Sequence, residues 1–441
     1  MNQPITGKEN ELKKTLGPFM LWGLGVGYVI SGNYFGWNLG LAEGGTWGAA
    51  IAIFFIILMY ITFTFSYTEM ACAIPRAGGA FSYAERGLGK QLGFLAGMSQ
   101  NIEFIFAPPA IASAIGAYFS IFFPEWNVLW VGIGAYLIFT LLNVVGLQIA
   151  ATFELFITIV AVLGLLFFAG VTLPEFDASN LSTKGFHQGY MGIVAAIPFA
   201  IWFFLAIEGV ANVAEETINP QKNILRGFGS ALLTLVILCL LTFVSAVGVG
   251  GWEAIVYPDE TGIASDSPLP LAMEMVVGSD HSYYHLLTFI ALFGLVASFN
   301  GIILAAGRTT FEFGRVGYAP KVIGKVNKKF KTPGNALLFN MVIGIIALLT
   351  GKTGEIITIA VFGALGLYIL SMIAFFYLRK KEPDLERPFR VPMYPLFPMV
   401  ALVIASISML AMILYNFMLA LLFFAMLIGS FVFFRIFIYK P

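Results

Sequence analysis

Apolar residues come in long blocks in this chain, and these blocks constrain its fold more than any other feature. A run of roughly 20 apolar residues is long enough to cross the hydrocarbon core of a bilayer as a helix. Of the 441 residues, 59% are hydrophobic and 11% are charged, whereas a soluble protein carries about 25% charged residues. Backbone polar groups in so many spans are satisfied only within helices. The sequence therefore predicts an all-α integral membrane protein.

About twelve blocks have the length of a membrane span. They lie near residues 17–42, 46–73, 92–122, 127–147, 152–174, 190–214, 228–250, 284–310, 334–350, 354–378, 397–414 and 416–438. We expect an N-terminal segment over 1–16, a first set of five helices over 17–174 and a second set over 190–378. Two additional helices over 397–438 complete the chain.

The basic residues fall almost entirely on one side of this arrangement. With residues 1–16 in the cytoplasm, all of the 24 Lys and Arg residues except Lys184 and Lys352 lie in or beside cytoplasmic segments. The loop 251–283 on the other side holds acidic residues and no basic residue. Because Lys and Arg favour the cytoplasmic side, we expect a multi-pass protein of the cell membrane with both ends in the cytoplasm.

Composition argues against several classes of function. A net charge of zero leaves no basic surface to attract phosphate, so nucleic acid is not expected as a partner. The two cysteines, Cys72 and Cys239, lie far apart in apolar blocks and form no metal-binding spacing. Paired carboxylates could serve a membrane-embedded enzyme as acid and base, but no nucleophile or metal cluster accompanies them. We expect no catalytic residue, no metal and no cofactor, and the sequence does not indicate an oligomeric state.

Two blocks are interrupted at mid-membrane depth. In the first block the run 29–36 places polar and flexible residues there, and in the sixth the run 202–209 places a carboxylate and a glycine. These blocks begin the two sets of five helices, a pattern typical of inverted repeats with broken helices. Broken ends expose carbonyls and amides that can hold a cation and an anion. The alternative is that Gly32, Gly36 and Gly40 serve close helix packing.

Two carboxylates lie near the middle of apolar blocks. An ionised group at that depth costs ~2.5–3.5 kcal/mol on insertion scales, so Glu103 and Glu208 require a bound cation or a proton. We predict that both line a transport site and that both carry a coupling proton. The alternative for each is a protonated carboxyl bonded to a neighbouring carbonyl. Glu69 and Glu154 lie nearer the cytoplasmic ends of their blocks, within reach of water and arginine, and are predicted to be structural.

The predicted substrate-binding residues lie in the two interrupted runs, on the third block and on the eighth block. Their carboxylates, carbonyl groups and aromatic faces suit an ammonium group. We expect the ammonium between Glu103 and Glu208. The predicted set is Ser31, Gly32, Asn33, Tyr34, Glu103, Trp202, Leu205, Glu208 and Asn300.

Several motifs spread over most of the chain share the pattern of a known family. They are Ser31-Gly32, the run 68–83, the segment 215–224, the loop 317–320 and the segment 386–392. Together they resemble the amino acid–polyamine–organocation permeases. The resemblance implies alternating access by a LeuT-like fold of two inverted five-helix repeats with two extra helices.

Within that superfamily the chain looks most like the ethanolamine permeases. The resemblance is carried by the runs 32–38, 103–112, 197–209 and 293–299. It implies symport, with import of ethanolamine or a close small amine, whose hydroxyl would lie near Asn33 or Ser31. In amino acid relatives, the amides that match Ser31-Gly32 bind the substrate carboxylate, so an amino acid permease or exchanger is the alternative.

The fifth block departs from the family pattern. Some proton-driven relatives keep a lysine there, at the place where sodium-driven relatives hold an ion, and Ala161 takes that place here. We expect protons as the coupling ion, with sodium as the alternative. The other expected partners are the small-molecule substrate and the lipid bilayer.

Overall fold

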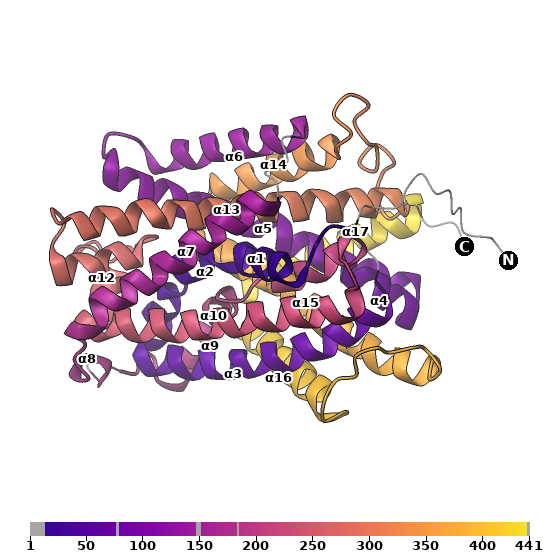
Figure 1. The fold of residues 1–441 in the computed structure, drawn as a ribbon, viewed down its shortest axis with the longest axis horizontal. Coiled ribbons are helices and arrows are strands. Elements are labelled where there is room, and N and C mark those ends of the chain that lie inside the picture. The colour runs from indigo at the N-terminus through magenta and orange to yellow at the C-terminus, as the bar shows by residue number, and fades with distance from the viewer. Residues whose placement is uncertain (1–13, 76–78, 147–150, 183–184, 439–441) are drawn as a thin grey trace.

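The computed structural model of the chain is a bundle of helices (Figure 1). It describes residues 14–75, 79–146, 151–182 and 185–438. Within these ranges all regular structure is helical, apart from an isolated bridge between Leu16 and Thr217. The predicted all-α class is therefore confirmed. Most of the predicted N-terminal segment 1–16 lies outside the described residues, and so does Arg76 in the motif 68–83.

Ten helical segments are long and apolar enough to cross a membrane, and each coincides with a predicted span. They are α3 (Asn38–Ala73), α5 (Lys90–Phe122), α6 (Val128–Val145), α7 (Ala151–Thr172), α9 (Gly189–Trp202) with η3 (Ile207–Glu216), α10 (Pro220–Gly250), α13 (Ser282–Arg315), α15 (Thr353–Lys381), α16 (Leu396–Tyr415) and α17 (Phe417–Phe433).

The two remaining predicted spans are built from shorter pieces. The first consists of α1 (Pro18–Val29), α2 (Ser31–Tyr34) and the beginning of α3. Gly45 kinks α3 with φ 65 and so separates the first predicted span from the second. The ninth is α14 (Gly334–Leu348). With the ten longer segments, these two make the twelve expected spans within the described chain.

Short helices connect the spans at the two ends of the bundle. They are α4 (Gly79–Leu88), η2 (Leu173–Glu175), α8 (Ser179–Ser182), α11 (Trp252–Val256) and α12 (Pro268–Val277). The segment η4 (Phe434–Ile438) continues the last span after α17. We call the end with α4 and the segment 379–395 the basic end, and the opposite end with α8 and α12 the acidic end (Figure 1). The predicted hydrophilic loop 251–283 contains the apolar helix α12, which is too short to cross a bilayer.

Small residues bring α5 and α15 together in the interior. A Cβ atom built on Gly363 of α15 would lie 2.6 Å from the backbone nitrogen of Glu103 and 2.6 Å from the carbonyl oxygen of Ser99. Such spacing lets two helix backbones touch, as is typical of packing inside membranes. The contact fixes Glu103 at the centre of the bundle, where none of its surface is exposed.

Candidate functional site

The first helix is interrupted where the sequence predicts. Helix α1 ends at Val29, and α2 adds one further turn before the backbone becomes extended at Phe35, with φ −158 and ψ 170. Gly36 follows with φ +86, a conformation that costs glycine little. The predicted break is confirmed, although residues 31–34 remain helical and the unwound part is confined to 35–37.

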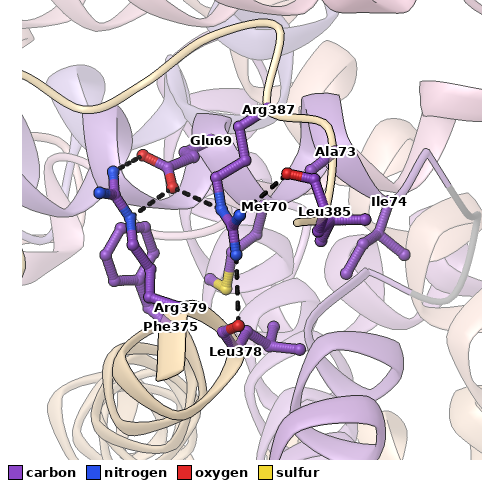
Figure 2. Close-up of a pocket in the computed structure, with 9 residues that line it drawn as sticks. All are labelled: Glu69, Met70, Ala73, Ile74, Phe375, Leu378, Arg379, Leu385 and Arg387. Carbon is purple, nitrogen blue, oxygen red and sulfur yellow. Dashed lines mark hydrogen bonds and ion pairs between the residues drawn. The ribbon is translucent and has the colours of Figure 1, made fainter. Parts of the chain in front are cut away.

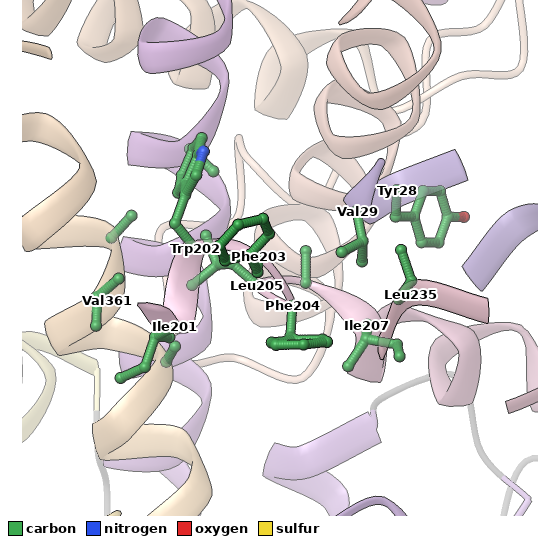
Figure 3. Close-up of a cluster of buried hydrophobic side chains, with 14 of the residues drawn as sticks. Tyr28, Val29, Ile201, Trp202, Phe203, Phe204, Leu205, Ile207, Leu235 and Val361 are labelled. Atoms are coloured by element: carbon green, nitrogen blue, oxygen red, sulfur yellow. The ribbon is translucent and has the colours of Figure 1, made fainter. Parts of the chain in front are cut away.

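The second break separates α9 from η3. Helix α9 ends at Trp202, and Ala206 turns the chain with φ +74 before the 3-10 helix begins at Ile207. A positive φ at a residue other than glycine is strained and persists where the surroundings hold it. Figure 3 shows Phe204 and Leu205 at this turn, among buried apolar side chains. The predicted interruption of the sixth span is confirmed.

The two breaks lie directly against each other. A Cβ atom on Gly32 would collide with the carbonyl oxygen of Trp202, so glycine is needed for this approach. The indole nitrogen of Trp202 donates to the carbonyl oxygen of Phe35 at 3.1 Å. The Tyr118 hydroxyl donates to the carbonyl oxygen of Tyr34 at 2.8 Å. These side chains satisfy carbonyl groups that the unwound backbone leaves without helical partners.

Two predicted residues, Glu103 and Glu208, form a carboxyl pair at the second break. Neither has any exposed surface, and the two groups lie within hydrogen-bonding reach of each other. The Ala206 amide donates to Glu103 Oε1 at 3.2 Å, and the Tyr368 hydroxyl donates to Glu208 Oε2 at 3.1 Å. The other oxygen of each group is buried without a further partner. A proton shared between the two groups satisfies both oxygens and removes one of two adjacent negative charges.

Two tyrosines that sequence reasoning missed connect this pair to α9. The hydroxyls of Tyr60 on α3 and Tyr368 on α15 lie 3.0 Å apart. Tyr60 also lies 3.5 Å from the carbonyl oxygen of Ile201, at the end of α9. Both tyrosines occur singly in apolar blocks, so no local pattern marks them.

The first break contributes one polar side chain without a partner. The Asn33 side chain is completely buried, and neither its oxygen nor its nitrogen has a hydrogen-bond partner. The Ser31 amide instead donates to Ser298 Oγ at 3.0 Å, and that hydroxyl donates to the carbonyl oxygen of Gly27 at 2.6 Å. Ser298 thus anchors α1 to α13, a role that sequence reasoning missed.

Tyr34 and Asn300 lie in different surroundings. The Tyr34 hydroxyl donates to the carbonyl oxygen of Ala161 on α7 at 2.7 Å, so it ties the break to α7. Asn300 accepts a hydrogen bond from Asn143 on α6 at 2.8 Å. Residues 298 and 300 point to different sides of a helix, and Ser298 faces α1. The structure therefore does not bring Asn300 to the breaks with the other predicted residues.

At the basic end a different carboxylate is saturated with partners (Figure 2). Glu69 on α3 accepts two hydrogen bonds from Arg379, at 2.8 Å and 2.5 Å, and one from the Val391 amide at 2.7 Å. Arg387 Nε lies 3.3 Å from Glu69 Oε1. The arginine partners expected for Glu69 are present, and they join α3 to α15 and to the segment that follows it.

Glu154 differs from that expectation. Only 5% of its surface is exposed, and its Oε1 has no hydrogen-bond partner. Arginine was expected within its reach, but no described residue forms an ion pair with it. The reason is tertiary packing, because glycines on α1 and α13 allow α1 to cover Glu154.

At the acidic end the chain closes over the breaks with hydrogen bonds. Asn38 donates to the carbonyl oxygen of Ser265 at 2.7 Å. The neighbouring Asp266 accepts from the Thr353 hydroxyl at 2.8 Å. Burial raises the pKa of Asp266 from its usual 3.8 to about 6, against the opposing effect of the Thr353 hydrogen bond. This carboxyl can therefore change its charge within a mildly acidic range.

The fold and site together define a multi-pass membrane protein with two broken helices around a buried carboxyl pair. Among the described residues no cluster of potential metal ligands accompanies the pair. Comparison with known families gives the finer assignment. A family model described as amino acid permease matches residues 16–438, and the chain belongs to that family.

Three curated relatives illustrate this membership. The chain is 27% identical to the methylthioribose transporter of Bacillus subtilis (strain 168), over 89% of this chain and 87% of that one. It is 27% identical to the branched-chain amino acid permease BcaP of the same organism, over 90% of this chain and 88% of that one. It is also 27% identical to the low-affinity putrescine importer PlaP of Escherichia coli (strain K12), over 84% of this chain and 83% of that one.

Proposed function

We propose that the protein is a secondary active transporter that imports ethanolamine or a close small amine by alternating access, coupled to protons. The observation that carries this proposal is the buried Glu103–Glu208 pair. With one shared proton the pair keeps one negative charge, and an ammonium group neutralises that charge within the protein. Intramembrane carboxylates commonly mark such substrate and proton pathways.

The surroundings of the pair suit an amino alcohol. The ammonium group would lie between Glu103, Glu208 and the carbonyl groups at the end of α9, beside the Trp202 ring. The hydroxyl would reach the Asn33 amide, which is buried and lacks a partner. A carboxylate is less well served, because the Ser31 amide already donates to Ser298.

Transport across a membrane requires access from two sides in turn. We propose that residues 17–174 and 190–378 form two inverted repeats of five helices, each beginning with a broken helix. The basic end would face the cytoplasm, because Lys and Arg favour that side. Movement of one repeat relative to the other around the carboxyl pair would then expose it to each side.

The test is uptake of labelled ethanolamine into proteoliposomes, with an inward proton gradient and with none. We expect the gradient to stimulate uptake and unlabelled ethanolamine to compete with it. A sodium gradient without a pH difference serves as the comparison for the coupling ion. Absence of ethanolamine uptake under all of these gradients would overturn the proposal.

An amino acid permease or exchanger is the second candidate. The family description and the relative BcaP support it. The two candidates differ in the effect of adding a carboxylate to the ligand. Alanine in excess leaves ethanolamine uptake unchanged under the first proposal. Strong competition by alanine would favour the second.

A further inference from the structure

Glu154 is a buried carboxyl that the amine site does not use. It lies on α7, with 5% of its surface exposed and with Oε1 buried and without a hydrogen-bond partner. An ionised carboxylate in such a place is disfavoured, because its Oε1 loses water and gains no hydrogen bond in return. Burial therefore favours the neutral form of this group in the arrangement seen here.

Close helix packing places Glu154 beneath α1. A Cβ atom on Gly27 of α1 would lie 2.7 Å from Thr158 Oγ1 and 3.1 Å from Glu154 Oε1. A Cβ atom on Gly301 of α13 would lie 2.6 Å from the Tyr28 ring and 3.5 Å from Glu154 Oε1. Glu154 Oε1 thus lies where α1, α7 and α13 meet, and the docked α1 separates it from water.

No charged group on the surrounding helices neutralises Glu154. Helix α1 carries no charged residue, and on α7 Glu154 is the only one. Arg308 on α13 pairs with Glu216 at 3.3 Å. On α10, Lys222 and Arg226 are exposed. The Thr158 hydroxyl and the Tyr28 phenol are the other polar groups near Glu154 in the contacts described above, and both are neutral and carry no compensating charge.

A proton is the cation that fits this site. The gap beside Gly27 is too narrow for a methyl group without a shift of Thr158 or Glu154, and among the described residues Glu154 belongs to no cluster of potential metal ligands. We infer that Glu154 is a proton-binding carboxyl, separate from the amine site, that holds its proton while α1 is docked on α7 and α13. When α1 moves away, water reaches the carboxyl and the proton passes to that water. The position of α1 and the proton on Glu154 are then thermodynamically linked.

The same helix contact continues into the first break. Gly27 lies one turn before Ser31, and both residues are held to α13 through Ser298. A movement of α1 that exposes Glu154 therefore also releases the first break. If the protein transports amines as proposed above, Glu154 would couple proton movement to the opening of the site.

Infrared spectroscopy of the purified protein tests proton binding without any substrate. At neutral pH the wild type shows the C=O stretch of a protonated carboxyl, and Glu154→Gln lowers that band. Glutamine has nearly the shape of a protonated glutamate, so the variant keeps the unfolding temperature of the wild type. Glu355→Gln, at an exposed ion-paired position, leaves the band unchanged. An unaltered band in Glu154→Gln, or a clear loss of thermal stability, overturns the inference.

Proteoliposomes test the coupling. Exchange of labelled for unlabelled ethanolamine at equal pH on both sides persists in Glu154→Gln, whereas accumulation driven by a proton gradient is lost. Retained accumulation contradicts the inference, and so does a loss confined to sodium-driven uptake. If the wild type fails to carry ethanolamine, the proposed function fails, while the infrared result still decides whether Glu154 binds a proton.

Discussion

Glu69 at the basic end and the Glu103–Glu208 pair at the breaks are buried to a similar degree, yet they are neutralised in different ways. Two arginines and a backbone amide surround Glu69. The pair instead receives hydrogen bonds from neutral donors, and two of its oxygens lack another partner. A permanent positive partner fixes a carboxylate in one state. A carboxyl pair without one can exchange its proton for another cation, which is the property a transport site needs.

The largest expected effect is on the pair. Replacing both members by glutamine leaves the ammonium group without its buried counterion, a loss typical of a broken buried ion pair at about 3 kcal/mol or more. That energy corresponds to a loss of about 100-fold or more in ethanolamine affinity. We expect the double variant Glu103→Gln/Glu208→Gln to show it in concentration-dependent uptake. The matched control is Glu274→Gln, at an exposed position on α12, and a similar loss there would remove the distinction.

An effect of at most similar size, on stability and not on substrate binding, is expected at Glu69. The change Glu69→Gln leaves the guanidinium groups of Arg379 and Arg387 without their shared counterion. We expect the free energy of unfolding to fall by about 3 kcal/mol, while the folded fraction keeps its apparent affinity for ethanolamine. Denaturant unfolding and uptake measure the two quantities. Breaking the exposed Lys352–Glu355 pair with Glu355→Gln should change stability by less than about 1 kcal/mol.

The smallest effect is expected at Asp266. Its pKa is raised from 3.8 to about 6, so the folded state binds a proton more tightly than the unfolded state does. The resulting stabilisation is fully present below about pH 4 and is lost as the pH rises through about 6. Asp266→Asn should therefore flatten the pH dependence of the unfolding temperature across this range and stabilise the protein at pH 7. The gain is on the order of 1 kcal/mol, because partial exposure to water weakens the effect of burial.

A control separates this effect from a general loss of negative charge at the acidic end. Asp259 is exposed, and hydrogen bonds from Thr261 lower its pKa. Asp259→Asn should not stabilise the protein at pH 7. Equal stabilisation by both variants would show that the burial of Asp266 is irrelevant.

Features encoded locally were predictable from the sequence. Long apolar blocks predicted the spans, and polar or glycine residues within them predicted both breaks. The carboxylates Glu103 and Glu208 stood out because ionised groups are expensive inside a membrane. That they lie within reach of each other depends on the contact between Glu103 on α5 and the turn at Ala206, which no spacing in the sequence encodes.

Features that depend on tertiary contacts were not predictable. Tyr60, Tyr368 and Ser298 lie within apolar helices, and only the packed structure brings their hydroxyl groups to the breaks. Glu154 lies near the end of its span, where water was expected, but the glycine contacts of α1 exclude water from it. Such contacts depend on which helix faces cover each other.

The central claim is that a small amine binds at the carboxyl pair, and calorimetric titration of the purified protein with ethanolamine tests it most directly. The account predicts binding to the wild type and to Glu274→Gln, with strong loss in the double variant Glu103→Gln/Glu208→Gln. Binding of ethanolamine to that double variant with the affinity of the wild type would contradict it.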